Sequence, residues 1–236
     1  MRTEEIAQGF LAAPEEGTHP GVVLIHDVWG LGELYREFAR RLASAGFVAL
    51  AVDLYHGEPK IEDPGRFMRE LDDPAILREL GAARERLSSD AAVGSKPVGV
   101  AGFCMGGGYA LQAACGDLGF AACVAFYGLV SHAHGILHAP HGLDPRKKPR
   151  DVLAALPELG CPTLGIYGDR DEFVPQDDVR ALEAGIARAG RGGGVERYAG
   201  CGHAFLNELR PAAYEPEAAA DAWRKMLAFF RTHLGS

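Results

Sequence analysis

Short apolar runs alternate with helix-like segments along most of the chain. The runs that are apolar nearly throughout span 22–27, 47–53, 98–101, 121–127 and 162–167. Runs of this kind are typical of strands that are buried on both faces of a parallel sheet. The segments with helical spacing or helical composition are 33–45, 74–87, 176–189 and 216–234. We therefore expect strands and helices to follow one another in turn.

This alternation predicts an α/β fold, in which a mainly parallel central sheet is flanked by helices on both faces. Residues 5–13 indicate a weak first strand and 195–198 a last one, whereas 54–73 reads as an irregular connection. No repeat or linker interrupts the 236 residues, so we expect a single domain over 1–236. Chemistry in such folds gathers in the loops at the C-terminal ends of the strands.

The run at 98–101 leads into Gly102-Phe-Cys104-Met-Gly106, which reads as a strand, a sharp turn and a helix. Gly-x-Cys-x-Gly is the nucleophile-elbow pattern with sulfur in place of oxygen. Side chains at Gly102 and Gly106 would collide with the elements that the turn joins. At a helix N-terminus, free N–H groups favour a thiolate at Cys104. The alternative is a tight junction that holds a buried, inert cysteine.

Two later loops offer the groups that a cysteine nucleophile requires. One contains Asp169, Asp171 and Glu172, and the other places His203 between small residues. The order nucleophile, acid, histidine is that of α/β-hydrolases. The imidazole can take the thiol proton, and an acid can fix the imidazole tautomer. The residues alone leave the acid open, because Asp169 could also cap its turn and Glu172 is a third option.

An oxyanion that forms during acyl transfer needs two N–H donors. We expect them to be the backbone amides of Met105, directly after the nucleophile, and of Val28, in the loop after the strand at 22–25.

Several motifs resemble the dienelactone hydrolase (carboxymethylenebutenolidase) family of the α/β-hydrolase superfamily, and the resemblance covers nearly the whole chain. The motifs are His26-Asp-Val-Trp-Gly-Leu31, Val52-Asp-Leu-Tyr55, Gly102-Phe-Cys-Met-Gly-Gly107, Tyr127-Gly128, Gly168-x-x-Asp171-x-Phe-Val-Pro175 and Gly202-His-x-Phe205. The resemblance implies an α/β-hydrolase fold without a cofactor. It also implies that a Cys104-His203-Asp171 triad opens a lactone or small ester through a thioester acyl-enzyme. Asp171 is selected because the family's acid precedes x-Phe-Val-Pro.

Two positions depart from the family pattern. Asp27 stands where a family glutamate holds the resting thiol, so we expect it to tune Cys104 with a shorter reach. Asn207 stands where the family has an arginine for the substrate carboxylate, although Arg210 is close by. The candidates for a second family arginine are Arg66, Arg69 and Arg78. The departures affect the identity of the substrate more than the hydrolytic chemistry.

We expect Trp29, Tyr55, Phe205 and Asn207 to bind substrate, with core packing as the alternative for the aromatic residues. The segment 130–150 is predicted to be a lid or rim loop over the pocket. It holds four of the nine histidines, at 132, 134, 138 and 141. The spacing of His134 and His138 would suit a metal on a helix, but the glycines and proline around them oppose a helix, so we expect no metal.

Composition narrows the function classes. The net charge is −8, and the only basic cluster, 146–150, is too short to indicate nucleic-acid binding. No apolar run reaches the ~18 residues of a membrane span, and 1–6 has no signal core. We therefore expect a cytoplasmic monomer or homodimer that acts on a small molecule.

The five cysteines form no CxxC pair, which argues against a disulfide framework. The rival hypothesis is a non-hydrolytic protein of the same fold, which binds a small molecule or senses redox state through Cys104. Cys201 would then be a possible resolving thiol.

Overall fold

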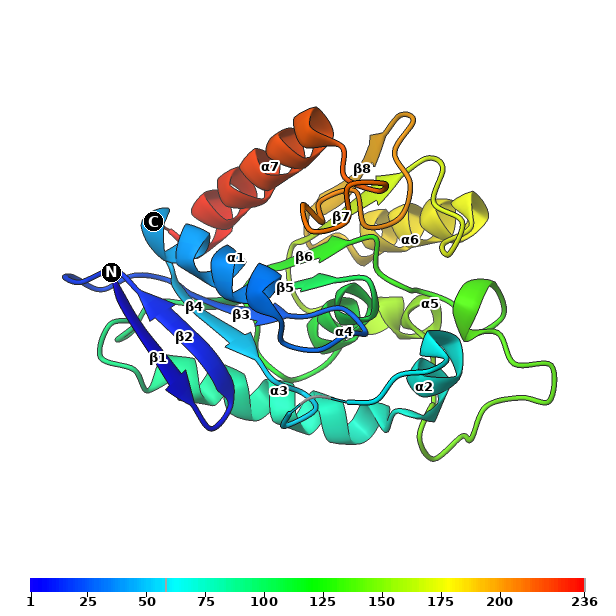
Figure 1. The fold of residues 1–236 in the computed structure, drawn as a ribbon, viewed down its shortest axis with the longest axis horizontal. Helices are drawn as coiled ribbons and strands as arrows, with labels where there is room; N and C mark the ends of the chain where they lie inside the picture. The colour runs from blue at the N-terminus through cyan, green and yellow to red at the C-terminus, as the bar shows by residue number, and fades with distance from the viewer. Residues whose placement is uncertain (58, 236) are drawn as a thin grey trace.

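The apolar runs form one eight-stranded sheet in the computed structural model, which describes residues 1–57 and 59–235 (Figure 1). The strands are β1 (Arg2–Ile6), β2 (Gly9–Ala13), β3 (Gly21–Ile25), β4 (Val48–Val52), β5 (Val98–Phe103), β6 (Cys123–Phe126), β7 (Thr163–Gly168) and β8 (Gly193–Tyr198). Their spatial order is β1-β2-β4-β3-β5-β6-β7-β8. The pairings from β4 to β8 are all parallel, which confirms the predicted mainly parallel sheet.

The N-terminal segment differs from the single strand predicted over residues 5–13. It is a hairpin in which β1 pairs antiparallel with β2, and β2 pairs antiparallel with β4. The strand β1 is mostly exposed and polar, so its hydrophobicity gave no signal, whereas β2 is fully buried. Gly9 permits the turn because its φ is +136°, and a Cβ there would lie 2.1 Å from the Ala51 carbonyl oxygen.

Helices cover both faces of the sheet (Figure 1). They are α1 (Glu33–Ser44), α2 (Pro64–Glu70), α3 (Asp73–Ser88), α4 (Met105–Ala114), α5 (Val152–Ala155), α6 (Gln176–Ala189) and α7 (Pro216–Leu234), with short 3₁₀ turns η1 (Gly135–Leu137) and η2 (Leu156–Glu158). On one face α1 meets α7 through the rings of Phe38 and Trp223, whose centroids are 5.0 Å apart. The helices α3, α4, α5 and α6 form a row in which each contacts the next. No helix in the described part of the chain has the length and apolarity needed to cross a membrane.

The helix α2 lies in the region that was expected to be irregular. The Asp63 side chain caps its N-terminus by accepting a hydrogen bond from the Arg66 amide, and Pro64 occupies the first turn. Both are favourable helix-start signals. Seven residues are too few for hydrophobic periodicity to show, so the capping residues were the only available signal.

Candidate active site

Cys104 sits at the sharp turn between β5 and α4. Its φ and ψ are 55° and −117°, a strained conformation for a side chain other than glycine. The flanking glycines are required by close backbone approach. A Cβ at Gly102 would lie 2.0 Å from the Gly106 carbonyl oxygen, and a Cβ at Gly106 would lie 2.3 Å from the His26 carbonyl oxygen. The turn therefore has the geometry of a nucleophile elbow.

Backbone strain gathers around this elbow. Four non-glycine residues in the described part of the chain have positive φ, and three of them are Cys104, Tyr127 and Ala204. Tyr127 directly follows β6, and Ala204 directly follows His203. The Tyr127 ring stands edge-to-face against the His203 ring at 4.9 Å. Strain of this kind is typical of functional sites, where the surrounding structure holds an unfavourable backbone in place.

Asp171 and His203 form a buried pair. Oδ2 of Asp171 accepts a hydrogen bond from His203 Nδ1 at 2.8 Å. Oδ1 of the same carboxylate accepts from the Phe173 and Val174 amides at 2.9 and 3.1 Å. The loop after β7 thus fixes the carboxylate, and the carboxylate fixes the imidazole tautomer with the proton on Nδ1.

The other two acids of this loop have different surroundings. Oδ1 of Asp169 accepts a hydrogen bond from the Gly200 amide at 2.7 Å, which is a turn-stabilising contact. Glu172 is exposed. Of the three acids, only Asp171 contacts His203 in the structure.

The second nitrogen of His203, Nε2, is buried and has no hydrogen-bond partner among the described residues. Burial lowers the pKa of His203, but the negative charge of the Cys104 thiolate and the hydrogen bond to Asp171 outweigh it and raise the pKa to about 10. A negative charge on Cys104 and a positive charge on His203 would therefore favour each other.

Two backbone amides border the thiol. Val28 and Cys104 line the same cavity, and Met105 is the first residue of α4. In the described part of the chain neither the Val28 amide nor the Met105 amide donates a hydrogen bond. Both donors are thus available to a bound molecule.

The cavity above the thiol has a volume of about 540 Å³. Asp27, Val28, Cys104 and His203 lie at its catalytic end. The remaining walls contain Trp29, Gly65, Met68, Arg69, Leu129, Ile136, His138, Phe173 and Arg210, among others. Two separate segments contribute to these walls: α2 with its cap, and the segment 130–150. A cavity of this size suits a ligand larger than a few atoms.

Comparison with known proteins assigns the family. The family model described as "Dienelactone hydrolase family" matches residues 7–234 of this chain. The chain belongs to the dienelactone hydrolase family.

Individual relatives agree with this assignment. A protein named "Protein usf" from Aquifex pyrophilus is 32% identical, with 96% of this chain and 94% of that protein covered. A Bradyrhizobium protein named "Probable 2-oxo-3-(5-oxofuran-2-ylidene)propanoate lactonase" is 31% identical, with 95% and 89% covered. A crystal structure from Klebsiella pneumoniae, named "Putative Dienelactone Hydrolase", superposes with a TM-score of 0.82 at 28% identity, covering 94% of this chain and 91% of the other. The expected α/β-hydrolase-type fold is confirmed, and the protein is a hydrolase of dienelactone hydrolase type.

The two departures from the dienelactone hydrolase pattern occupy different surroundings. Asp27 lines the cavity with Cys104, and its Oδ1 accepts a hydrogen bond from the Trp29 amide at 2.9 Å. Asn207 is buried outside the residues that line the cavity, and its Oδ1 accepts from the Leu209 amide at 3.0 Å. The structure thus places Asn207 outside the cavity lining, where its side chain closes its own turn.

Arginines reach the cavity from elsewhere. Arg210 lies with its guanidinium carbon 5.5 Å from the centroid of the Trp29 ring, and Arg69 extends from α2. Arg66 pairs with Glu70 on the surface, and Arg78 is exposed. The hydrolase thus has two cavity arginines, and neither lies at the position that the family pattern indicates after the histidine.

Of the three aromatic residues that were expected to bind substrate, one lines the cavity and two do not. Trp29 lines the cavity and is 47% exposed. Phe205 is 0% exposed and packs against Tyr127 and Tyr198, so the core alternative holds. Tyr55 is half-buried beside His26, and its hydroxyl contacts Met105 Sδ at 3.1 Å rather than lining the cavity. Burial and side-chain direction correct the expectation for these two residues.

Phe173 is a cavity residue that sequence reasoning did not single out. It is 37% exposed, and its ring stands edge-to-face against His203 at 5.0 Å. The available signal was its place two residues after Asp171, which matches the place of Trp29 two residues after Asp27. The amide of each aromatic residue donates to the carboxylate two positions before it, so the loops after β3 and β7 each present one aromatic ring to the cavity.

Of the four histidines in the segment 130–150, only His138 lines the cavity, together with Gly135 and Ile136 of the same segment. His134 instead pairs with Asp178 at the start of α6, with 3.0 Å between Nδ1 and Oδ1. Within the described ranges, no group of three or more potential ligand residues is placed to hold a metal ion.

Proposed function

We propose that this hydrolase cleaves carboxylic esters or lactones through Cys104, His203 and Asp171. One observation carries the proposal. His203 has Nδ1 bound to Asp171, while Nε2 is buried, unpaired among the described residues and close enough to the Cys104 thiolate to be strongly influenced by its charge. This is the arrangement that a nucleophile, a base and an orienting acid require.

In the acylation step, Cys104 Sγ attacks the carbonyl carbon of the substrate and forms a C–S bond. The carbonyl oxygen becomes an oxyanion, which the amides of Val28 and Met105 stabilise. The intermediate then collapses, the C–O bond to the alcohol breaks, and the His203 imidazolium donates its proton to the leaving oxygen. In a lactone this oxygen stays attached to the acyl group.

Deacylation reverses the roles. A water molecule attacks the thioester carbonyl while His203 Nε2 takes one of its protons. The C–S bond breaks, the carboxylic acid product leaves and the thiolate at Cys104 is restored. Asp171 holds the imidazole in one tautomer throughout and stabilises its charged form.

Asp27 has the role of a tuning carboxylate in this proposal. Its carboxylate is fixed by the Trp29 amide and borders the same cavity as the thiol. A negative charge here opposes formation of a free thiolate, and so favours the state in which His203 is protonated to compensate it.

The cavity walls support a substrate that combines a planar apolar group with an anionic group. Trp29 and Phe173 expose ring surface at the catalytic end, and aromatic faces stack on planar unsaturated groups. Arg69 and Arg210 supply charge for a carboxylate. The name of the Bradyrhizobium relative specifies a lactone that carries a propanoate group, which has this combination of features.

The redox alternative receives less support. Cys201 would have to act as a resolving thiol, but burial, together with the charges of Glu215 and Asp169, raises the pKa of Cys201. A protonated thiol resolves a sulfenic acid slowly. All five thiols are free of disulfides, which accords with the cytoplasmic location that we propose.

The test is turnover of aryl esters and lactones by the wild type, Cys104→Ala and Cys201→Ala. We expect Cys104→Ala to lose turnover and Cys201→Ala, the matched thiol control, to retain it. Full activity in Cys104→Ala would contradict the proposal. Absence of turnover in the wild type, with rapid alkylation of Cys104, would favour the redox alternative.

A further inference from the structure

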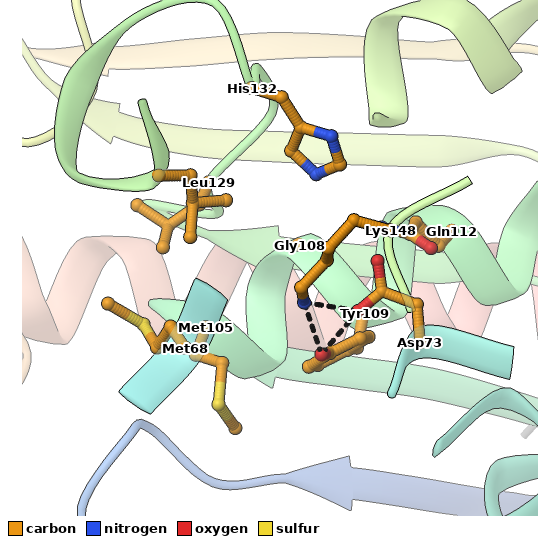
Figure 2. A pocket seen from close by; sticks show the side chains of 10 residues that line it. Met68, Asp73, Met105, Gly108, Tyr109, Gln112, Leu129, His132 and Lys148 are labelled. Atoms are coloured by element: carbon orange, nitrogen blue, oxygen red, sulfur yellow. Dashed lines mark hydrogen bonds and ion pairs between the residues drawn. The ribbon is translucent and has the colours of Figure 1, made fainter. Parts of the chain in front are cut away.

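A buried ion pair lies beside the substrate cavity, outside the catalytic residues (Figure 2). Lys148 Nζ donates to Asp73 Oδ1 and, at 3.2 Å, to the Tyr109 hydroxyl. The Tyr109 hydroxyl donates to the same Asp73 oxygen at 2.6 Å. The side chains of Lys148 and Asp73 are only 4% and 2% exposed. Burial of two charges is costly, so a stability role alone explains this pair poorly.

The three residues lie on elements next to the cavity walls and not in the walls themselves. Asp73 begins α3, three residues after α2 ends. Lys148 lies at the far end of the segment 130–150, and Tyr109 is in α4, the helix that follows Cys104. The Asp73 amide also donates to the Lys147 carbonyl oxygen at 2.9 Å. The cluster therefore ties both wall segments to the helix of the nucleophile.

The same two wall segments are joined a second time at the cavity itself. Arg69 Nη1 donates to the Ile136 carbonyl oxygen at 2.8 Å, and both residues line the cavity. The wall is thus held at its base by the buried cluster and at its inner edge by one half-buried hydrogen bond. The base has three side-chain hydrogen bonds and the inner edge has one, so the base is the stronger attachment.

A small void beside the cluster shares two lining residues with the cavity. Met68 and Leu129 line both the substrate cavity and a void of about 20 Å³ beside Asp73, Tyr109 and Lys148 (Figure 2). A void of this size holds no more than about one water molecule, so it is no substrate site. A movement of the cluster would instead reach the cavity through Met68 and Leu129.

We propose that Lys148, Asp73 and Tyr109 are positioning residues that hold the α2 and 130–150 walls against α4 and so set the width of the cavity away from Cys104. The proposal rests on ester hydrolysis at Cys104 only for its kinetic readout. It makes the cluster a determinant of specificity for the part of the substrate that lies far from the reacting carbonyl.

The test compares Lys148→Met, Asp73→Asn and the double variant on two esters, phenyl acetate and a bulkier 2-naphthyl ester with a carboxylate. We expect each single variant to raise KM for the bulky ester roughly tenfold, as loss of a well-placed contact of about 1.4 kcal/mol would. The kcat for phenyl acetate should stay within about twofold, because the catalytic loops are separate from the cluster. The double variant should resemble the single ones, since all three remove the same tie.

Two further variants keep the test decisive if a single variant folds poorly. Tyr109→Phe removes one hydroxyl and leaves the ion pair, so it should raise the same KM by about threefold or less. Arg150→Gln, whose exposed partner is Glu158, is the control in the same region and should leave KM unchanged. Trypsin should cut after Arg146 or Lys147 faster in Lys148→Met than in Arg150→Gln, because the segment is released.

Three results would overturn the proposal. The first is an equal loss of kcat on both esters, and the second is a set of KM effects that add in the double variant. The third is a lowered Tm without a change in KM and without faster cleavage by trypsin. Failure of ester hydrolysis itself is distinguishable, because the wild type would then turn over neither ester. The cleavage rates would still test the positioning role in that case.

Discussion

The catalytic loops and the outer walls of the cavity are built in different ways. Each side chain that we propose to be catalytic lies in a loop after a strand of the parallel sheet. The register of the sheet therefore brings Asp27, Cys104, Asp171 and His203 to the same edge. The outer walls come from α2 and the segment 130–150, which are attached through a few side chains. The backbone of the sheet therefore positions the proposed catalytic side chains, whereas the shape of the cavity depends on a few side-chain contacts. Substitutions in the loops should therefore affect kcat, and substitutions in the walls should affect KM.

The largest expected effect separates the two acids of the β7 loop. Asp171→Asn should lower kcat by about 10³–10⁴-fold, because the amide no longer selects the tautomer of His203. Asp169→Asn keeps an acceptor for the Gly200 amide and should change kcat by no more than about twofold. Steady-state kinetics on one aryl ester measures both. Equal losses in the two variants would contradict the assignment of the acid.

An intermediate effect concerns the pKa of His203. In the wild type this pKa is raised to about 10, although burial opposes the shift, because the Cys104 thiolate stabilises the imidazolium. Cys104→Ala removes that charge and retains the burial, so the pKa of His203 should fall. Titration of the imidazole Cε1–H signal by NMR measures the change.

The same shift predicts a dependence of stability on pH. The folded pKa of His203 lies above its ordinary value of 6.5, so protonation of His203 stabilises the fold fully below pH 6.5. This contribution should disappear as the pH rises through about 10. The difference in unfolding free energy between wild type and Cys104→Ala should shrink over that interval. A pKa of His203 that is the same in both proteins would disprove the coupling.

The smallest effects should come from the aromatic walls. Trp29→Ala and Phe173→Ala should each raise KM for the naphthyl ester by about 3–10-fold, since an aromatic contact contributes roughly 0.5–1.5 kcal/mol. Phenyl acetate, which covers less of the cavity, should be affected less. Leu209→Ala is the control, because Leu209 is exposed but does not line the cavity. KM values that rise equally with both esters would contradict a stacking role.

The sequence predicted the parts of the molecule in which backbone geometry and residue type coincide. Gly102 and Gly106 identified the elbow because only glycine allows such close backbone approach. The motif around His203 extended the prediction to Phe205 and Asn207, and the structure places neither residue in the cavity lining. Ala204 has a φ of +62°, and the chain beyond it turns Phe205 into the core and Asn207 onto its own backbone.

The outer walls were less predictable for a physical reason. The helix α2 and the turn η1 are too short for periodicity, and Arg69 and Arg210 reach the cavity through long side chains whose direction depends on packing. Likewise, the residues next to Asp73 and Lys148 in the sequence do not predict that these two side chains pair across 75 positions. Proximity of this kind is a property of the tertiary structure.

The central claim is that Cys104 forms a covalent acyl-enzyme. Rapid quenching of the reaction with an activated aryl ester, followed by mass spectrometry of the digested protein, tests it most directly. We predict one acyl group on the peptide that contains Cys104, removable by hydroxylamine as a thioester, and a longer-lived adduct in His203→Ala if that variant still acylates. Turnover at the normal rate with no adduct on Cys104, or with the acyl group on another residue, would contradict the account.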